Sequence, residues 1–369
     1  MTDILNPSAQ LINDGIDRVA RYIPNEPGIH DVRFFITGAT GFVGVWLLKT
    51  LLRLSEARNW RISITILSRR PEVFARKHPE FFKQVNVIKG DVLDFEFPAG
   101  EFKYIIHAAA DTSAQVNKDA PVYLFDSIVS GTKRVMEFAA RCGCRKLLYV
   151  SSGAVYGPQP THIPRVDESY MGGPDPTQPT GNDLYGNAKR TAELITTLYA
   201  KQYGFEAKIA RLFSFVGPYL PIDSHFAVGN FISNYIKGQP IIIKGDGAPF
   251  RSYMYAADMI LWILKILFDA PASRPYNVGS DFAVTIAELA GIIAKLVQPE
   301  PPVTIMQQQR SEKSDIYVPS LQRAREELGL DLYFDLEEAI KTTIQWHIDK
   351  DAAHTEESPE WRESLSARK

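Results

Sequence analysis

A hydrophobic segment that runs directly into three evenly spaced glycines is the feature that most constrains the fold of this chain. Residues 34–44 read Phe-Phe-Ile-Thr-Gly-Ala-Thr-Gly-Phe-Val-Gly and lead into an amphipathic stretch. Gly38 permits a tight turn after a strand, Gly41 lets the backbone approach a pyrophosphate, and Gly44 lets a helix pack closely on the strand. N–H groups at the helix N-terminus then face the phosphates, so the segment predicts a dinucleotide-binding turn. The expected cofactor contacts are Gly38, Thr40, Gly41, Phe42 and Val43.

Apolar runs alternate with amphipathic stretches between residues 32 and 212. The apolar runs predict strands at Val32–Thr37, Ile62–Leu67, Val85–Ile88, Tyr104–His107, Lys146–Ser151 and Ala207–Leu212. The amphipathic stretches predict helices at Val43–Leu54, Val122–Ala140 and Asp183–Tyr203. Strands that alternate with helices form βαβ units, which build a parallel sheet covered on both faces. We therefore expect an α/β fold with a Rossmann-type, doubly wound parallel sheet.

The pattern changes after Gly217-Pro218, where short apolar segments and prolines become frequent. We expect short strands at Ile241–Ile243 and Tyr276–Val278, with helices at Ala257–Leu267, Ile286–Val297, Leu321–Leu328 and Leu336–His347. The predicted organisation has four parts. They are a helical lead-in over residues 1–31, the Rossmann domain with the catalytic residues over 32–217, a smaller mixed α/β substrate lobe over 218–350 that shares part of the sheet, and a flexible tail over 351–369.

Charge and composition exclude several classes of protein. Lys and Arg number 41 against 43 Asp and Glu, a net charge of −2, so no global attraction for nucleic acid or an acidic membrane is expected. The sequence contains no run of about 18 apolar residues, so no membrane span is expected. The first residues do not have the pattern of a signal peptide. We therefore expect a cytoplasmic protein. Cys142 and Cys144 are the two cysteines, and without a matching Cys/His pair they predict no metal site.

The residues after the second expected strand indicate which dinucleotide binds. An NAD-specific site places a carboxylate here for the ribose hydroxyls, whereas this chain has Ser68, Arg69 and Arg70. Guanidinium groups match the charge and bidentate geometry of a 2′-phosphate. We therefore expect NADP, with NAD as the alternative. After the fourth strand, Ala108, Ala109 and Ala110 would let the cofactor lie against the backbone.

Tyr185 and Lys189 form a Tyr-x-x-x-Lys pair at the start of an expected helix. A separation of four places both side chains on one helical face. A free phenol has a pKa near 10 and is a poor acid or base at neutral pH. A nearby ammonium would lower the pKa of Tyr185 toward the working range. The pair predicts acid–base chemistry beside the dinucleotide, and both residues are also expected to contact the cofactor.

The Gly-x-x-Gly-x-x-Gly spacing resembles the short-chain dehydrogenase/reductase superfamily. The segment Gly41-Phe42-Val43-Gly44 resembles its extended branch, the NAD-dependent epimerase/dehydratase family of nucleotide-sugar-modifying enzymes. The resemblance implies that Ser152, four residues before the Tyr of Val155-Tyr156-Gly157, is the catalytic hydroxyl and that Ser151 is structural. It also implies adenine contacts from Asp91 and Val92. His107, at the end of a strand, is expected to be a packing residue rather than a catalyst.

The same resemblance implies where a nucleotide sugar would bind. Arg251 matches the arginine that clamps the diphosphate in relatives, and Ser214 stands where they carry an asparagine. His225 and Phe226 lie near the place where relatives touch the nucleotide, and Asn277 matches a turn that is more often structural. The expected substrate contacts are Thr112, Ser113, Ser152, Ser214, His225, Phe226 and Arg251.

These expectations favour NADPH-dependent reduction of a 4-keto-6-deoxy nucleotide sugar. Related 4,6-dehydratases carry an Asp-Glu pair directly after the catalytic hydroxyl, whereas Gly153 and Ala154 stand here and cannot move protons. One alternative is a redox-neutral 4-epimerase with tightly bound NAD. Another is a catalytically silent nucleotide-binding module, against which Ser152, Tyr185 and Lys189 argue. The resemblance also implies a homodimer formed through a four-helix bundle of the helices at Val122–Ala140 and Asp183–Tyr203.

Overall fold

A seven-stranded parallel sheet forms the centre of the molecule. The computed structural model describes residues 7–26, 29–110, 118–177, 181–222, 226–307 and 315–356. The sheet has the order β11-β6-β5-β4-β1-β2-β3, and all of its pairings are parallel. Its strands are β1 (Val32–Thr37), β2 (Ile62–Ser68), β3 (Asn86–Lys89), β4 (Tyr104–His107), β5 (Lys146–Ser152), β6 (Glu206–Leu212) and β11 (Pro275–Val278). The predicted Rossmann-type α/β sheet is confirmed.

The order of the strands reverses at β1, which lies between β2 and β4. The chain builds β1, β2 and β3 toward one edge of the sheet and then returns to add β4, β5 and β6 on the other side. The carboxyl ends meet in register, since Thr37 of β1 pairs with His107 of β4, which in turn pairs with Tyr149 of β5. Ligands of open α/β sheets bind in the crevice at such a reversal point.

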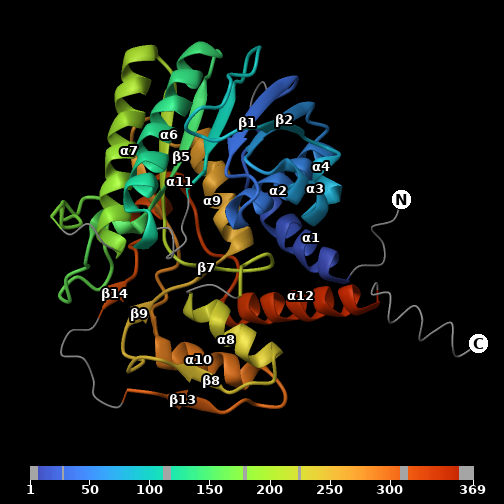
Figure 1. Cartoon of the computed structure of the whole chain (residues 1–369), viewed down its shortest axis with the longest axis vertical. Helices are drawn as coiled ribbons and strands as arrows, with labels where there is room; N and C mark the ends of the chain where they lie inside the picture. Colours follow the sequence, from blue (N-terminus) through green and yellow to red (C-terminus); the bar gives the residue numbers. More distant parts are fainter. Residues whose placement is uncertain are drawn as a thin grey trace, which may run out of the picture.

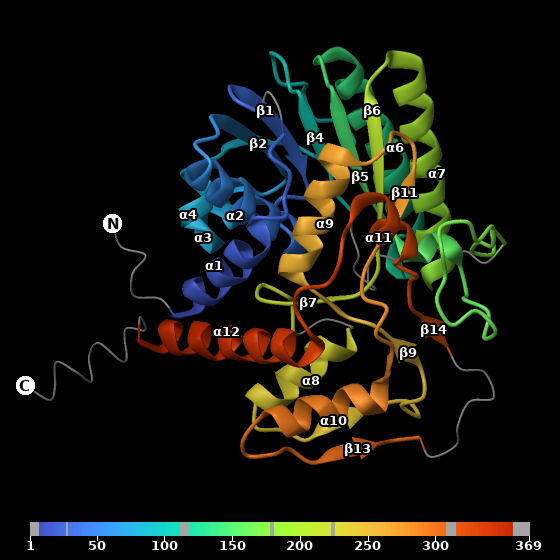
Figure 2. The ribbon, with the colours of Figure 1, turned by 180° about the vertical axis from the view of Figure 1, so that it is seen from behind.

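Helices cover both faces of the sheet (Figures 1 and 2). On one face, α6 (Pro121–Arg141) and α7 (Gly181–Tyr203) pack side by side over β4, β5 and β6. The other face carries α2 (Phe42–Ala57), α9 (Ala256–Asp269) and α1 (Pro7–Ala20). The apolar faces of these helices form two clusters of buried side chains, one on each side of the sheet.

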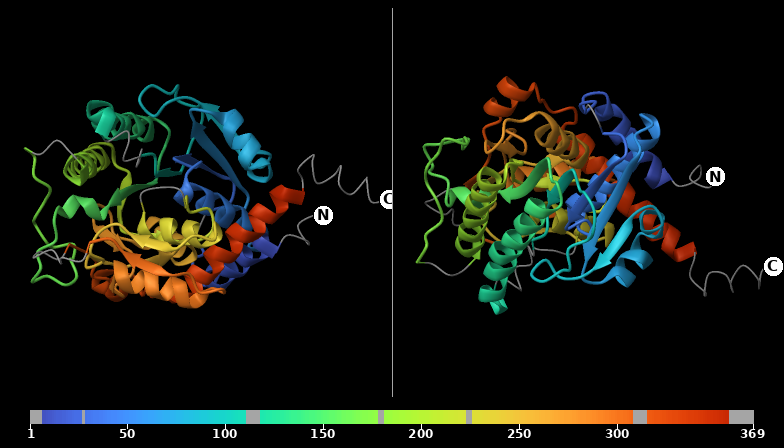
Figure 3. Two further views of the ribbon diagram at one scale, coloured as in Figure 1. Left: turned by 60° about the horizontal axis from the view of Figure 1, so that its bottom comes forward. Right: turned by 90° about the horizontal axis from the view of Figure 1, so that it is seen from above.

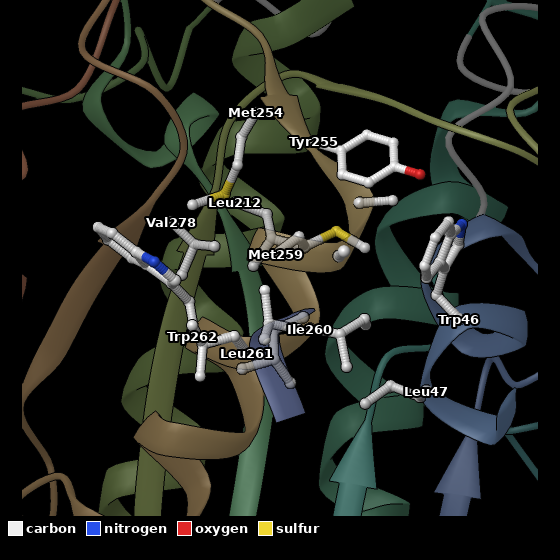
Figure 4. Packing of buried hydrophobic residues seen from close by; sticks show 14 of the residues in the cluster. Trp46, Leu47, Leu212, Met254, Tyr255, Met259, Ile260, Leu261, Trp262 and Val278 are labelled. Atoms are coloured by element: carbon white, nitrogen blue, oxygen red, sulfur yellow. The ribbon is translucent and has the colours of Figure 1, made fainter. Parts of the chain in front are cut away.

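Helix α9 is buried almost all round, because it lies between the sheet and helices α1 and α2. Figure 4 shows Met259 of this helix beside Leu212 of β6 and Ile260 on the side toward Trp46 of α2. Trp262 lies on the opposite side of the helix, next to Val278 of β11. Although α9 and β11 come from the part of the chain beyond residue 218, α9 packs on the sheet and β11 pairs with β6. The long hydrophobic run of α9 explains this position, since exposure would be costly.

Most of the remaining segments lie beyond one end of the main sheet and come forward in the left view of Figure 3. They form three small sheets, with strand orders β10-β7, β12-β9-β14 and β13-β8. The strands are β7 (Phe215–Val216), β8 (Ile241–Ile243), β9 (Phe250–Arg251), β10 (Met254–Tyr255), β12 (Val284–Thr285), β13 (Val303–Ile305) and β14 (Ile316–Tyr317). The helices are α8 (Ala227–Ile236), α10 (Ile286–Leu296), α11 (Gln322–Leu328) and α12 (Leu336–Glu356), and two short ones, α3 (Pro71–Lys77) and α4 (Pro79–Phe82), flank β3.

Helix α12 continues to Glu356, beyond the predicted helix end at His347 and the predicted tail boundary at residue 351. Residues 357–369 lie outside the described part of the chain. Within the described ranges, no helix combines the length and the apolar character needed to cross a membrane.

Two helical glycines provide a matched test of the close packing of α2 on β1. A Cβ at Gly44 would lie 2.3 Å from Ala39 Cα and from the Gly38 carbonyl oxygen, whereas a Cβ at Gly291 of α10 would meet no atom within 4 Å. Gly44→Ala should lower the free energy of unfolding by about 3 kcal/mol or more, because backbone must move. Gly291→Ala should raise it by about 1 kcal/mol. Urea unfolding measures both, and equal effects would contradict this packing.

Candidate active site

The glycine turn joins β1 to α2 at the point where the sheet order reverses. Gly38 has φ +72°, and a Cβ there would lie 2.5 Å from the carbonyl carbon and oxygen of Ala108. Gly41 caps α2 and is exposed, and a Cβ there would approach nothing closer than the Gly38 oxygen at 3.6 Å. Gly38 and Gly44 therefore allow close packing, while Gly41 leaves the N-terminus of α2 open. This cradle fits a dinucleotide pyrophosphate.

Hydrogen bonds of His107 link the carboxyl end of β4 to that of β1 and to α6. Its Nδ1 lies 2.7 Å from the Thr37 hydroxyl, and its Nε2 lies 3.1 Å from the Thr132 hydroxyl of α6. Ala109 N donates to the same Thr37 hydroxyl at 3.2 Å, beside the partly exposed Ala108 and Ala110. Burial, with a smaller contribution from nearby Lys189, lowers the pKa of His107 to about 3. Its role as a packing and hydrogen-bonding residue agrees with the prediction.

The predicted ribose contacts lie at the end of β2. The Ser68 side chain is buried and accepts a hydrogen bond from Arg70 N at 3.3 Å. Arg69 and Arg70 are exposed, and a guanidinium N–H of Arg69 donates to the Tyr123 hydroxyl of α6 at 3.0 Å. Two cations therefore border the cofactor crevice on the β2 side.

The predicted adenine contacts follow β3. A carboxylate oxygen of Asp91 accepts from Leu93 N at 3.0 Å, which fixes the turn. Val92 packs against Gly131 of α6, where a Cβ would lie 2.8 Å from a Val92 methyl carbon.

Ser152, Tyr185 and Lys189 come together at the carboxyl end of β5. Ser152 ends the strand and caps the 3₁₀-helix η2 (Gly153–Tyr156), and its hydroxyl accepts from Ala154 N at 3.1 Å. Tyr185 lies on α7, which packs on η2, and Ser152 is near enough to influence the pKa of its phenol. One turn later, Lys189 Nζ donates to the Val150 carbonyl at 2.8 Å and lies 5.7 Å from the centre of the Tyr185 ring.

Burial controls the protonation of this group. It lowers the pKa of Lys189 to about 7, against an opposing effect of Glu193. It also raises the pKa of Tyr185, and the interaction with Ser152 only partly offsets the rise. The expected lowering of the Tyr185 pKa by Lys189 is therefore not found, and desolvation of the phenol dominates instead. A phenol that stays protonated at neutral pH is suited to donate a proton.

A polar network behind the site holds β5, β6, α7 and β11 together. Glu193 accepts from Ser151 Oγ at 2.6 Å and forms a bidentate pair with Arg211 at 2.9 and 2.7 Å. Arg211 also donates to the Tyr156 hydroxyl at 3.0 Å, and that hydroxyl donates to Asn277 Oδ1 at 2.7 Å. Because strand residues alternate in direction, Ser151 faces this network while Ser152 faces the crevice. Structural roles for Ser151 and Asn277 agree with the sequence-based interpretation.

The predicted substrate contacts are only partly described. Arg251 of β9 forms an ion pair with Asp315 at 2.5 Å and donates to the Phe250 and Asp315 carbonyls at 2.8 and 3.1 Å. Ser214 is partly exposed, and its carbonyl accepts from Met254 N at 3.0 Å. Phe226 is 42% exposed at the start of α8. Thr112, Ser113 and His225 lie outside the described residues.

Sequence reasoning missed Tyr317, which lies beside Gly153, the residue after Ser152. A Cβ at Gly153 would lie 2.7 Å from the Tyr317 hydroxyl oxygen, and the Tyr317 ring centre lies 4.7 Å from that of Phe213. Its strand, β14, has only two residues and was too short to be predicted.

The model of the NAD dependent epimerase/dehydratase family matches residues 34–279 of this chain. The chain belongs to this family. Among curated relatives of this family member, UDP-glucuronic acid decarboxylase 6 of Arabidopsis thaliana is 28% identical over 84% of this chain and 87% of that protein. UDP-glucuronic acid decarboxylase 1 of Danio rerio is 27% identical over 85% of this chain and 72% of that protein.

Solved structures share the fold of this family member at low identity. UDP-glucose 4-epimerase of Thermotoga maritima, with UDP-glucose, has a TM-score of 0.71 and 20% identity over 86% of this chain and 99% of that one. An epimerase of Methanothermobacter thermautotrophicus has a TM-score of 0.74 and 21% identity, and the match covers 95% of this chain and 99% of that one. The dTDP-glucose 4,6-dehydratase DesIV of Streptomyces venezuelae, with NAD, has a TM-score of 0.71 and 21% identity. The match covers 87% of this chain and 98% of that one.

The buried Lys189 of this epimerase/dehydratase family member should give the stability of the protein a distinct pH dependence. Its pKa is about 7 in the folded chain and 10.5 ordinarily. Between these pH values only the unfolded chain holds the proton on Lys189. The free energy of unfolding should therefore rise with pH, by up to about 1 kcal/mol per pH unit. The raised pKa of Tyr185 acts only above pH 10.

Urea unfolding between pH 7.5 and 9.5 measures this slope. Lys189→Met should make it shallower than in the wild type, whereas Lys201→Met, at an exposed position of the same helix, should leave it unchanged. A wild-type slope retained in Lys189→Met would refute a lowered pKa for the lysine at this position.

Proposed function

We propose that this chain is an NAD(P)-dependent oxidoreductase of a nucleotide-activated sugar, and that it reduces a 4-keto-6-deoxy sugar with NADPH. The observation that carries the proposal is the assembly of Ser152, Tyr185 and Lys189 at the carboxyl end of β5, within the family's fold. A binding module would have no need of two hydroxyls and a desolvated amine in one place. The relatives named above act on nucleotide sugars according to their names.

The proposed chemistry divides between the cofactor and the side chains. The nicotinamide, when bound, supplies the hydride. Tyr185, which burial keeps protonated, donates its proton to the sugar oxygen as that oxygen gains negative charge. Ser152 donates a hydrogen bond to the same oxygen and holds it in place. Lys189, anchored on the Val150 carbonyl, compensates in its protonated form the negative charge left on the phenolate.

The substrate's diphosphate is proposed to bind at Arg251. A cavity of about 690 Å³ lies between α8 and the turn after β8, and its lining includes Phe231, Lys237 and Lys244. Pro249 in the wall of the cavity precedes Arg251 of β9 by two residues. A nucleoside in this cavity would place its phosphates beside the guanidinium, where they would compete with Asp315 for it.

The substrate and cofactor should be identified by a direct assay. Purified protein is mixed with 4-keto-6-deoxy nucleotide sugars and NADPH or NADH, and oxidation of the cofactor is followed by absorbance. Steady consumption of NADPH supports the reductase, and Tyr185→Phe should lower kcat roughly 100-fold or more.

The alternative is a redox-neutral 4-epimerase, supported by the UDP-glucose 4-epimerase of Thermotoga maritima among the solved structures of the same fold. Protein that purifies with NAD and interconverts UDP-sugars without net cofactor consumption would establish it in place of the reductase. UDP-glucuronic acid belongs in the same panel because the curated relatives are named for it. Cofactor binding without conversion of any sugar would leave only the silent module.

Arg69 tests the proposed preference for NADP. Arg69→Ala should weaken NADP binding about tenfold or more, since a charged hydrogen bond to the 2′-phosphate is lost, while NAD binding stays within about twofold. Calorimetry with both cofactors measures this difference. Arg76→Ala, an exposed arginine of α3, controls for the general loss of positive charge. Equal weakening of NAD and NADP would argue against the preference.

We also propose that two copies pair through α6 and α7. Leu194 and Leu198, one turn apart on α7, are 60% and 55% exposed, and Val122 of α6 is 72% exposed. A second copy of the same two helices would bury these side chains in a four-helix bundle. Light scattering should give twice the chain mass of 41.4 kDa, and a single chain mass would contradict the pairing.

A further inference from the structure

Tyr317 reaches the active site from a segment far along the chain. It lies on β14, where it pairs in register with Arg251 of β9. The next residue is held on both sides, because Val318 N donates to Gln159 Oε1 at 3.1 Å and the Val318 carbonyl accepts from Val166 N at 3.0 Å. The Tyr317 ring packs against Phe213. These contacts fix the direction of the phenol.

The phenol occupies space that Gly153 leaves open. A Cβ at Gly153 would lie 2.7 Å from the Tyr317 hydroxyl oxygen and 2.8 Å from two ring carbons of Phe213. Any side chain at position 153 would therefore displace the Tyr317 hydroxyl. In this chain the Tyr317 phenol of β14 occupies the space that a side chain at position 153, directly after β5, would otherwise fill.

Ser152 lies close to two phenols. Its hydroxyl accepts from Ala154 N at 3.1 Å, and the Tyr317 hydroxyl lies against Gly153, the next residue of the chain. Burial raises the pKa of both Tyr185 and Tyr317, and Ser152 partly offsets each rise. A serine hydroxyl has one hydrogen to donate and two places to accept. If Tyr317 donates to the second accepting place, the one serine hydrogen is left to point at the substrate oxygen.

We propose that Tyr317 is a positioning residue, whose hydroxyl donates to Ser152 and thereby directs the Ser152 hydrogen toward the substrate oxygen that Tyr185 protonates. This inference rests on the proposed function of Ser152. It makes the catalytic group dependent on β14, so the site is complete only when the segment after residue 315 is in place. Gly153 is the residue that makes the arrangement possible.

A kinetic double-mutant cycle tests whether Tyr317 acts through Ser152. Tyr317→Phe keeps the ring and should lower kcat roughly three- to tenfold, with KM within about twofold, because one hydrogen bond is lost. In the Ser152→Ala background the same substitution should have no further effect on kcat. Tyr170→Phe removes a phenol hydroxyl from the same small cluster and should leave kcat unchanged. Two results would overturn the proposal. One is a double variant whose loss in kcat equals the product of the two single losses, and the other is an unchanged kcat in Tyr317→Phe.

Unfolding of the same variants tests the contact without any substrate. The loss in urea midpoint for the double variant Ser152→Ala/Tyr317→Phe should be smaller than the sum of the two single losses, whereas Ser152→Ala and Tyr170→Phe should add. Additive losses for Ser152 and Tyr317 overturn the proposal whether or not a substrate is known. Absence of turnover by the wild-type protein on every nucleotide sugar overturns the proposed function instead, so the two failures are distinguishable.

Discussion

Close backbone contact between β1, β4 and α2 is the constraint on which the rest of the structure depends. Gly38 and Gly44 have no side chains, so the Gly38 turn can lie against Ala108 and the first turn of α2 against Ala39. This contact aims the N-terminus of α2 at the reversal point of the sheet. The hydrogen bonds of His107 then fix the neighbouring strand ends. Because parallel strands share one carboxyl edge, Ser152 of β5 is delivered to the same crevice.

Desolvation has opposite consequences for the two titrating groups of the site. It favours the neutral form of each, so the Tyr185 phenol keeps its proton while Lys189 gives its proton up more readily. A protonated phenol beside an amine whose pKa is about 7 is suited to transfer a proton to a developing alkoxide. The same burial makes every hydrogen bond in the site stronger.

Much of this fold was predictable because it depends on local patterns. The predicted strands of the main sheet lie within one residue of those observed, and the glycine turn and the Tyr185–Lys189 spacing are likewise short-range features. The small sheets were harder to predict, because two-residue strands such as β9 and β14 carry no periodicity. Tyr317 was missed for this reason. The Tyr185 pKa was also misjudged, since its burial is created by elements that a motif does not contain.

The sequence by itself determined the parallel sheet, the open N-terminus of α2 and the identity of the hydroxyls and amine near it, because strand period, glycine spacing and helix period are properties of neighbouring residues. Only the tertiary structure decided that Gly153 faces a phenol rather than empty space, that Arg251 meets Asp315, and that burial raises the pKa of Tyr185. Each of these depends on which distant segments pack together, and packing distance and desolvation cannot be obtained from separation along the chain.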